Sequence, residues 1–230
     1  MKIDLRQTRT LVISCQDQQD RRANIEAELK RVGMRCEFVD GIRCRPGIIG
    51  CALSHLKTLT QYADELPVLV LEDDCAVASS FRPVFDQPAG ADVAYLGVSI
   101  WGVFPEVYPY AIPMGAVATR HDENWLRLHN MVSAHAVLYL NPQVVVAARS
   151  AIMQGLVDNR PFDINIAFLQ KRFMALTPNE PLFFQDARFR GAEEATRQRL
   201  IPVENPADVQ VTRVGNSLSV SRPMPACQPI

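Results

Sequence analysis

Three consecutive carboxylates, Glu72, Asp73 and Asp74, directly follow the strongest apolar segment of the chain, residues 68–71. A segment that is apolar at every position is typical of a strand buried on both faces in a parallel sheet. Like charges so close together raise one another's pKa and destabilise the fold unless a cation offsets them. Carboxylate oxygens suit Mg²⁺ or Mn²⁺, which bridge the phosphate oxygens of nucleotides. The segment therefore predicts a metal and nucleotide site.

Alternation of side chains along the strand sends Glu72 and Asp74 to one side and Asp73 to the other. We therefore expect Glu72 and Asp74 to share one ion while Asp73 anchors a loop. The alternative is that the acids cap a following turn or helix. Their position at the end of a buried strand favours the metal site.

Two further side chains could take part in catalysis. His135 stands in an otherwise apolar segment, where it is either a hydrogen-bonded core residue or an additional metal ligand. Asp163 follows Pro161-Phe162 and is either the cap of the next helix or a carboxylate that points into a cleft as a general base. Spacing leaves both alternatives open.

Arg21 and Arg22 stand at the start of a predicted helix, where guanidinium groups and backbone amides could hold phosphate or the edge of a base. Gly47 and Gly50 precede a second helix, but the chain has neither the GxGxxG pattern nor the GxxxxGK pattern. A dinucleotide-binding dehydrogenase and a P-loop NTPase are therefore not supported. The aromatic residues between Trp101 and Tyr110 could stack on a sugar ring or pack the long loop 97–131.

Strands and helices alternate along the chain, as judged from apolar periodicity. The expected strands are 11–13, 36–39, 68–71, 91–97, 133–140, 175–177 and 182–184. The expected helices are a segment that ends at Gly33, then 51–63, 142–154 and 161–170. This order predicts an α/β fold with a mostly parallel central sheet flanked by helices, and such folds bind ligands at the carboxyl ends of their strands.

The composition restricts the class of protein. The chain has 230 residues, 48% of them hydrophobic, with 24 Lys and Arg against 25 Asp and Glu. A net charge of -1 gives no field that would attract nucleic acid. No apolar stretch approaches the length of a membrane span. Six cysteines are scattered without a CxxC pair, a pattern that fits neither a zinc site nor a dense disulfide framework and favours buried thiols in a reducing compartment. We expect a soluble intracellular protein with one domain over residues 1–204 and a tail over 205–230.

Taken in order, these motifs resemble glycosyltransferase family 25, which includes bacterial lipooligosaccharide galactosyltransferases and collagen galactosyltransferases. The matching segments are residues 11–13, 20–22, 40–42, 47–55, 68–74, 94–97, 133–136, 161–163 and 181–185. The most specific of them are 50–55, Gly-Cys-Ala-Leu-Ser-His, and 71–74, Leu-Glu-Asp-Asp. The resemblance covers most of residues 11–185.

The resemblance implies a GT-A type nucleotide-diphosphosugar transferase fold and an inverting transfer of a hexose, usually galactose. The implied donor is a UDP-hexose, the implied acceptor is a hydroxyl of a surface glycan such as lipooligosaccharide, and the implied cation is Mn²⁺ or Mg²⁺. Family analogy places such a protein in the cytoplasm, at the inner face of the cell membrane in peripheral association with it.

The resulting assignment gives each candidate a role. Asp163 is the expected base and Asp73 a supporting acid, and the expected metal ligands are Glu72, Asp74 and His135. The expected donor-binding residues are Ile13, Arg21, Arg22, Ser54, His55 and Glu72. Two other functions remain open: a metal-dependent nucleotidyl or phosphoryl transferase, and a non-catalytic domain that binds a nucleotide sugar or a glycan.

Overall fold

The computed structural model describes residues 1–63, 65–190, 199–214 and 217–222. Its centre is an eight-stranded sheet with the order β10-β11-β13-β7-β12-β4-β2-β3. The strands are β2 (Arg9–Ser14), β3 (Glu37–Asp40), β4 (Val68–Glu72), β7 (Val93–Tyr95), β10 (Ala118–Arg120), β11 (Trp125–Leu128), β12 (Ala136–Tyr139) and β13 (Ala175–Pro178).

Six of these strands run in one direction, and β11 and β12 run against them. The expected α/β class, with a central sheet between helices, is confirmed. The sheet is mostly parallel in strand direction, but its neighbouring pairs are mixed because each reversed strand lies between two strands of the majority direction. The reversed strand β12 pairs directly with β4.

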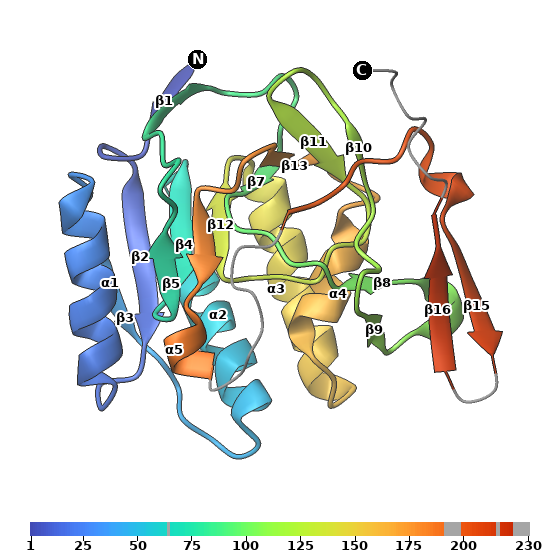
Figure 1. The fold of residues 1–230 in the computed structure, drawn as a ribbon. Helices are drawn as coiled ribbons and strands as arrows, with labels where there is room; N and C mark the ends of the chain where they lie inside the picture. Colours follow the sequence, from blue (N-terminus) through green and yellow to red (C-terminus); the bar gives the residue numbers. More distant parts are fainter. Residues whose placement is uncertain (64, 191–198, 215–216, 223–230) are drawn as a thin grey trace.

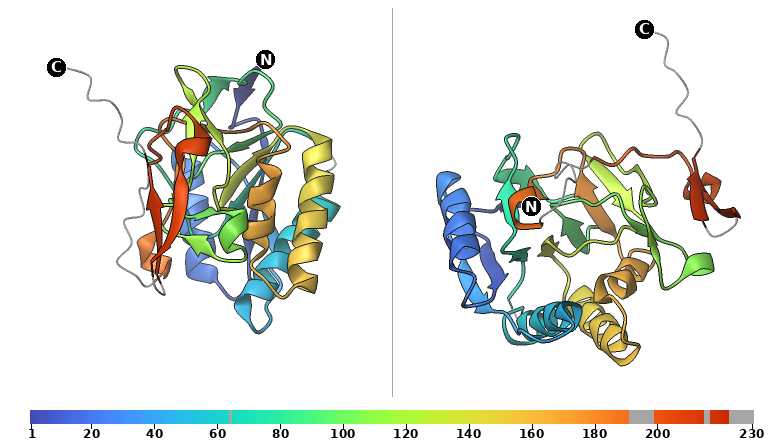
Figure 2. Two further views of the ribbon diagram at one scale, coloured as in Figure 1. Left: turned by 90° about the vertical axis from the view of Figure 1, so that its right-hand side faces the viewer. Right: turned by 60° about the horizontal axis from the view of Figure 1, so that its bottom comes forward.

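Helices cover both faces of the sheet (Figure 1). On one face α1 (Gln19–Arg31) packs Ile25 and Leu29 against inward side chains such as Val12 and Leu69. On the other face lie α2 (Gly47–Gln61), α3 (Pro142–Val157) and α4 (Phe162–Leu169), which Figure 2 shows grouped together. The alternation of β4 explains both cores, since successive residues of a strand point to opposite faces. All four apolar residues of β4 are buried.

Shorter elements surround the sheet. They are the pairs β1 (Lys2–Asp4) with β6 (Val84–Asp86), β5 (Cys75–Val77) with β14 (Phe183–Gln185), and β8 (Gly102–Val103) with β9 (Ala111–Ile112), together with the 3-10 helix η1 (Pro105–Val107) and the short helix α5 (Ala187–Arg190). The long segment 97–131, expected to be functional or partly structured, contains β8, β9 and two strands of the main sheet.

Part of the expected tail is structured. Residues 205–230 contain the 3-10 helix η2 (Pro206–Asp208) and a hairpin of β15 (Gln210–Val214) and β16 (Ser217–Ser221). The hairpin lies at the edge of the molecule opposite α1 (Figures 1 and 2). Val209 and Val220 pack with Val117, so apolar contact fixes this segment to the domain. Residues 223–230 of the expected tail lie outside the described residues.

Helix α2 begins at Gly47, four residues before the predicted start at Cys51. The two glycines of this first turn differ in their surroundings. A Cβ on Gly50 would lie 2.3 Å from the carbonyl oxygen of Ile42, whereas a Cβ on Gly47 would meet nothing within 4 Å. Only Gly50 is therefore required for the close approach of the preceding loop to the helix.

We expect Gly50→Ala to lower the free energy of unfolding by about 1–3 kcal/mol, because the loop must move to admit the methyl group. The matched variant Gly47→Ala should change it by less than about 1 kcal/mol, since alanine only improves helix propensity there. Urea unfolding of both variants measures the difference. Equal stabilities would contradict the packing of the loop on α2.

Candidate functional site

The acidic segment lies at the carboxyl edge of the sheet, where β2, β3 and β4 end beside α5 and the start of α2 (bottom of Figure 1). Because β12 is antiparallel to β4, the residue before β12 meets the last residue of β4. The Glu72 amide accordingly donates a hydrogen bond to the His135 carbonyl oxygen at 2.9 Å. The reversed strand thus brings His135 beside an acid 63 positions earlier in the chain.

Two cavities open at this edge and meet at two shared residues, Cys51 and Glu72. The smaller has a volume of about 300 Å³ and is lined by the three acids together with residues of β2, α1 and the loop before α2. The larger has a volume of about 440 Å³ and is lined by Trp101, Tyr110, His135 and Asp163 among others. Glu72 therefore lines both a cavity with three acids and a cavity with aromatic side chains.

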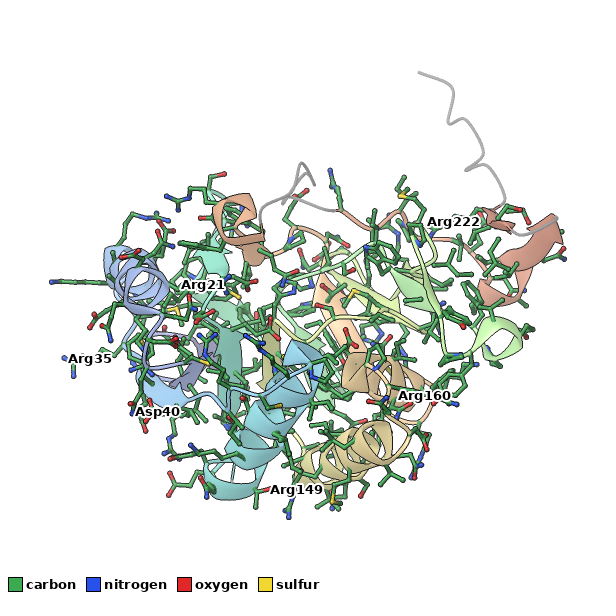
Figure 3. The ribbon with its side chains drawn as sticks, turned by 90° about the horizontal axis from the view of Figure 1, so that it is seen from below. Arg21, Arg35, Asp40, Arg149, Arg160 and Arg222 are labelled. Atoms are coloured by element: carbon green, nitrogen blue, oxygen red, sulfur yellow. The ribbon has the colours of Figure 1, made fainter. Side chains whose placement is uncertain are left out.

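Asp73 forms a bridge between elements. Its carboxylate accepts hydrogen bonds from the Ser14 hydroxyl at 2.6 Å and from Arg21 Nη1 at 3.1 Å. Arg21 also donates to the Phe189 carbonyl oxygen at 2.7 Å and lies over the Phe189 ring. Figure 3 shows Arg21 on the α1 side of the molecule. Asp73 thus links the end of β4 to α1 and α5 through Arg21, while its expected role as a supporting acid stays a prediction.

Asp74 lines the smaller cavity with Glu72 and Asp73. Its carboxylate accepts a hydrogen bond of 3.5 Å from Gln185, and its carbonyl accepts one of 2.7 Å from the Asp186 amide. A hard divalent cation commonly takes one or two protein carboxylates and completes its shell with substrate phosphates and water. The shared cavity of Glu72 and Asp74 fits this requirement for Mg²⁺ or Mn²⁺.

His135 lines the larger cavity and is absent from the lining of the smaller. Its Nδ1 shares a hydrogen bond of 2.8 Å with the Ser133 hydroxyl, and its ring packs so tightly that a Cβ on Gly97 would lie 2.0 Å from Nε2. Gly97 is therefore needed to accommodate the imidazole. The structure gathers Glu72 with Asp74 in one cavity and Glu72 with His135 in the other, so the three predicted metal ligands do not share a single compartment.

A different set of ligand atoms comes together at the boundary of the cavities. Cys51 Sγ, His55 Nε2 and a Glu72 carboxylate oxygen all lie within 4.8 Å of one another. Glu72 Oε1 is 3.0 Å from His55 Nε2 and 3.8 Å from Cys51 Sγ. His55 is fully buried and packs on the Phe162 ring. Reasoning from the sequence missed Cys51, although its position four residues before His55 on a helix was a usable signal.

Asp163 lies in the first turn of α4 and lines the larger cavity. It is not the cap, because that position belongs to Pro161. Burial of the carboxyl group and the negative charge of Glu72 raise the pKa of Asp163 to about 6, although its hydrogen bond from the Ile164 amide opposes the shift. Of the two alternatives from the sequence, the structure agrees with the carboxylate in the cleft.

The other predicted donor-binding residues occupy different positions. Ile13 and Ser54 line the smaller cavity, but the Ser54 hydroxyl accepts from the Ile42 amide and donates to the Gly50 carbonyl, so it already ties the loop to α2. Arg22 is not among the residues that line either cavity described above. It donates to the Ser14 carbonyl and to Asp40, whose pKa it lowers, and it ties β2 to β3.

Comparisons with known proteins add little to this geometry. No protein-family model matches the chain, and no curated protein matches it. Among solved structures, the chain is similar to CTP:phosphocholine cytidylyltransferase from Streptococcus pneumoniae, with a TM-score of 0.38 and 9% sequence identity over 80% of this chain and 76% of that chain. A likeness at this level does not bear on function. None of the described helices is long and apolar enough to cross a membrane.

The raised pKa of Asp163 predicts a dependence of stability on pH. The folded state binds this proton more tightly than the unfolded state, so Asp163 lowers the free energy of unfolding as the pH rises from about 4 to about 6. Asp163→Asn should therefore stabilise the protein at pH 7 by up to about 3 kcal/mol, at about 1.4 kcal/mol per pKa unit, and the gain should vanish below about pH 4. Urea unfolding at several pH values measures this, and a gain that is independent of pH would contradict the assignment.

Proposed function

We propose that this protein transfers a hexose from a nucleoside diphosphate sugar to a hydroxyl group of a glycan acceptor. The observation that carries the proposal is the pair of cavities that meet at the acidic edge of the sheet, with a desolvated carboxyl group, Asp163, in the larger one. Such a transfer needs one compartment for the nucleotide diphosphate and another for the sugar and its acceptor. The two must meet where the bond breaks.

The smaller cavity suits the nucleotide. It is lined by residues from the end of β2 and the start of α2 together with Glu72 and Asp74. These two side chains would hold Mn²⁺ or Mg²⁺, and the cation would offset the negative charge that grows on the departing diphosphate. Arg21 is committed to Asp73, so its role in this proposal is to fix that acid and α5 around the cavity.

The larger cavity suits the sugar and the acceptor. Trp101 and Tyr110 supply aromatic surface, which favours the apolar face of a pyranose ring. The acceptor oxygen forms a bond to the anomeric carbon as the bond from that carbon to the phosphate oxygen breaks. Asp163 accepts the proton that the acceptor hydroxyl loses. A pKa of about 6 leaves Asp163 ionised at neutral pH and makes it a stronger base than an ordinary aspartate.

A metal-dependent nucleotidyl transferase is the second candidate, because the carboxylates of the smaller cavity could serve Mg²⁺ in that reaction too. The charge of the larger cavity favours glycosyl transfer. Among its described lining residues there is no Lys or Arg, while Glu72 and Asp163 are both acids. A phosphorylated acceptor would meet two negative charges there, whereas a neutral hydroxyl of a sugar would not.

A screen of UDP-sugars with Mn²⁺ tests the proposed reaction. We expect release of UDP, with UDP-galactose as the preferred donor by family resemblance, and no UMP. Release of UMP with a sugar 1-phosphate would support the nucleotidyl transferase, and so would release of pyrophosphate when UTP and a sugar 1-phosphate replace the UDP-sugar. Calorimetry supplies the matched comparison: Asp74→Asn should lose metal-dependent UDP binding, and Asp208→Asn at an exposed position should retain it.

Asp163→Asn should lower kcat by about 10²–10⁴-fold, the range for loss of a general base, with UDP affinity unchanged. In the wild-type protein the acidic limb of the profile of kcat/KM against pH should lie between about pH 4 and pH 6, because a cation on Glu72 offsets part of the charge that raises the pKa of Asp163. Steady-state kinetics and UDP calorimetry on the same preparations check both points. Full turnover in Asp163→Asn would remove the assigned base.

A further inference from the structure

We propose that Cys51, His55 and Glu72 form a binding site for a thiophilic divalent cation such as Zn²⁺, distinct from the oxygen-ligand position between Glu72 and Asp74. Cys51 and His55 lie one helical turn apart on α2, and Glu72 meets them from the end of β4. The inference goes beyond the proposed function and does not depend on it.

The spacing of the ligand atoms fits tetrahedral zinc. With bonds of about 2.0–2.3 Å, neighbouring ligand atoms of such a site lie about 3.3–3.7 Å apart. Glu72 Oε1 lies 3.0 Å from His55 Nε2 and 3.8 Å from Cys51 Sγ, which bracket that range. The remaining pair, Cys51 Sγ and His55 Nε2, lies within 4.8 Å, so these two side chains would have to approach each other to seat the ion.

The donor set determines which cation the site prefers. A thiolate, an imidazole nitrogen and one carboxylate oxygen suit Zn²⁺, whereas Mg²⁺ and Mn²⁺ favour oxygen ligands. Cys51 and His55 are both hydrogen-bonded to Glu72. The incoming cation would replace the Cys51 thiol proton, which would pass to solvent, and it would bind the Nε2 lone pair of neutral His55, whose single ring proton would then lie on Nδ1.

An ion held by Cys51, His55 and Glu72 would keep one coordination position open. Cys51 and Glu72 line both cavities, so a three-ligand ion here would have its fourth position toward a cavity rather than toward the core. Asp74 and Asp163 line the same cavities and add negative potential that favours a cation. Because Glu72 belongs to both proposed metal positions, a zinc-type ion would compete with a hard ion for this carboxylate.

Absorption spectroscopy with Co²⁺, a probe for Zn²⁺, tests the site in the purified full chain under reducing conditions. We expect a cobalt–thiolate charge-transfer band in the near ultraviolet that reaches its limit at one equivalent and disappears when Zn²⁺ displaces the Co²⁺. Cys51→Ser should abolish the band. The matched variant Cys15→Ser, which removes a free thiol that lines the smaller cavity, should leave it unchanged.

Zinc affinity gives a second readout, measured on variants whose urea unfolding shows that they are folded. His55→Gln and Cys51→Ser should each weaken Zn²⁺ binding by more than about tenfold, since even the loss of a partner of a ligand costs 10–100-fold. Asp208→Asn, at an exposed position that lines neither cavity, should leave Zn²⁺ binding intact. Absence of the band in the wild-type protein, or its persistence in Cys51→Ser, would overturn the proposal. Both outcomes are independent of whether UDP-sugars are turned over.

Discussion

The accumulation of negative charge at the end of β4 is the constraint on which the rest of the site depends. Each acid there is compensated by a different part of the fold. Asp73 is paired with Arg21 and Ser14, Asp74 is held by Gln185 and the β14–α5 connection, and Glu72 is bonded to His55 and Cys51 of α2. Elements far apart in the sequence therefore meet at this edge because each supplies a partner to one carboxylate.

The reversed strand β12 explains why the two cavities differ. Had β12 run parallel to β4, its carboxyl end would lie beside the acids, and His135 would stand at the opposite edge of the sheet. Antiparallel pairing instead brings the start of β12 to Glu72, and His135 becomes part of the wall of the larger cavity. The tight packing of the ring against Gly97 fixes this wall. The end of β4 therefore lies between a cavity lined by all three consecutive acids and a cavity lined by aromatic side chains, His135 and Asp163.

The buried strand at 68–71 and the helical periodicity of residues 25–32 were strong local signals, and both elements are present. The short pair of β1 with β6 was not expected, because such strands carry little periodicity and depend on partners about 80 residues away. The residues of the site likewise divide into those with a local sequence signal and those brought together only by folding. The acidic segment was visible in the sequence because its residues are consecutive. The neighbourhood of Cys51 and Glu72 was not, because it arises only when α2 packs against the end of β4.

The Glu72 side chain lines both cavities, and this position between them constrains any mechanism at the site. Its contacts with His55 and Cys51 draw it toward α2, whereas a cation bound with Asp74 would draw it toward the smaller cavity. Its charge also raises the pKa of Asp163 across the larger cavity. A cation that neutralises Glu72 would weaken that effect and make Asp163 a weaker base. Metal occupancy and base strength are therefore coupled through a single side chain.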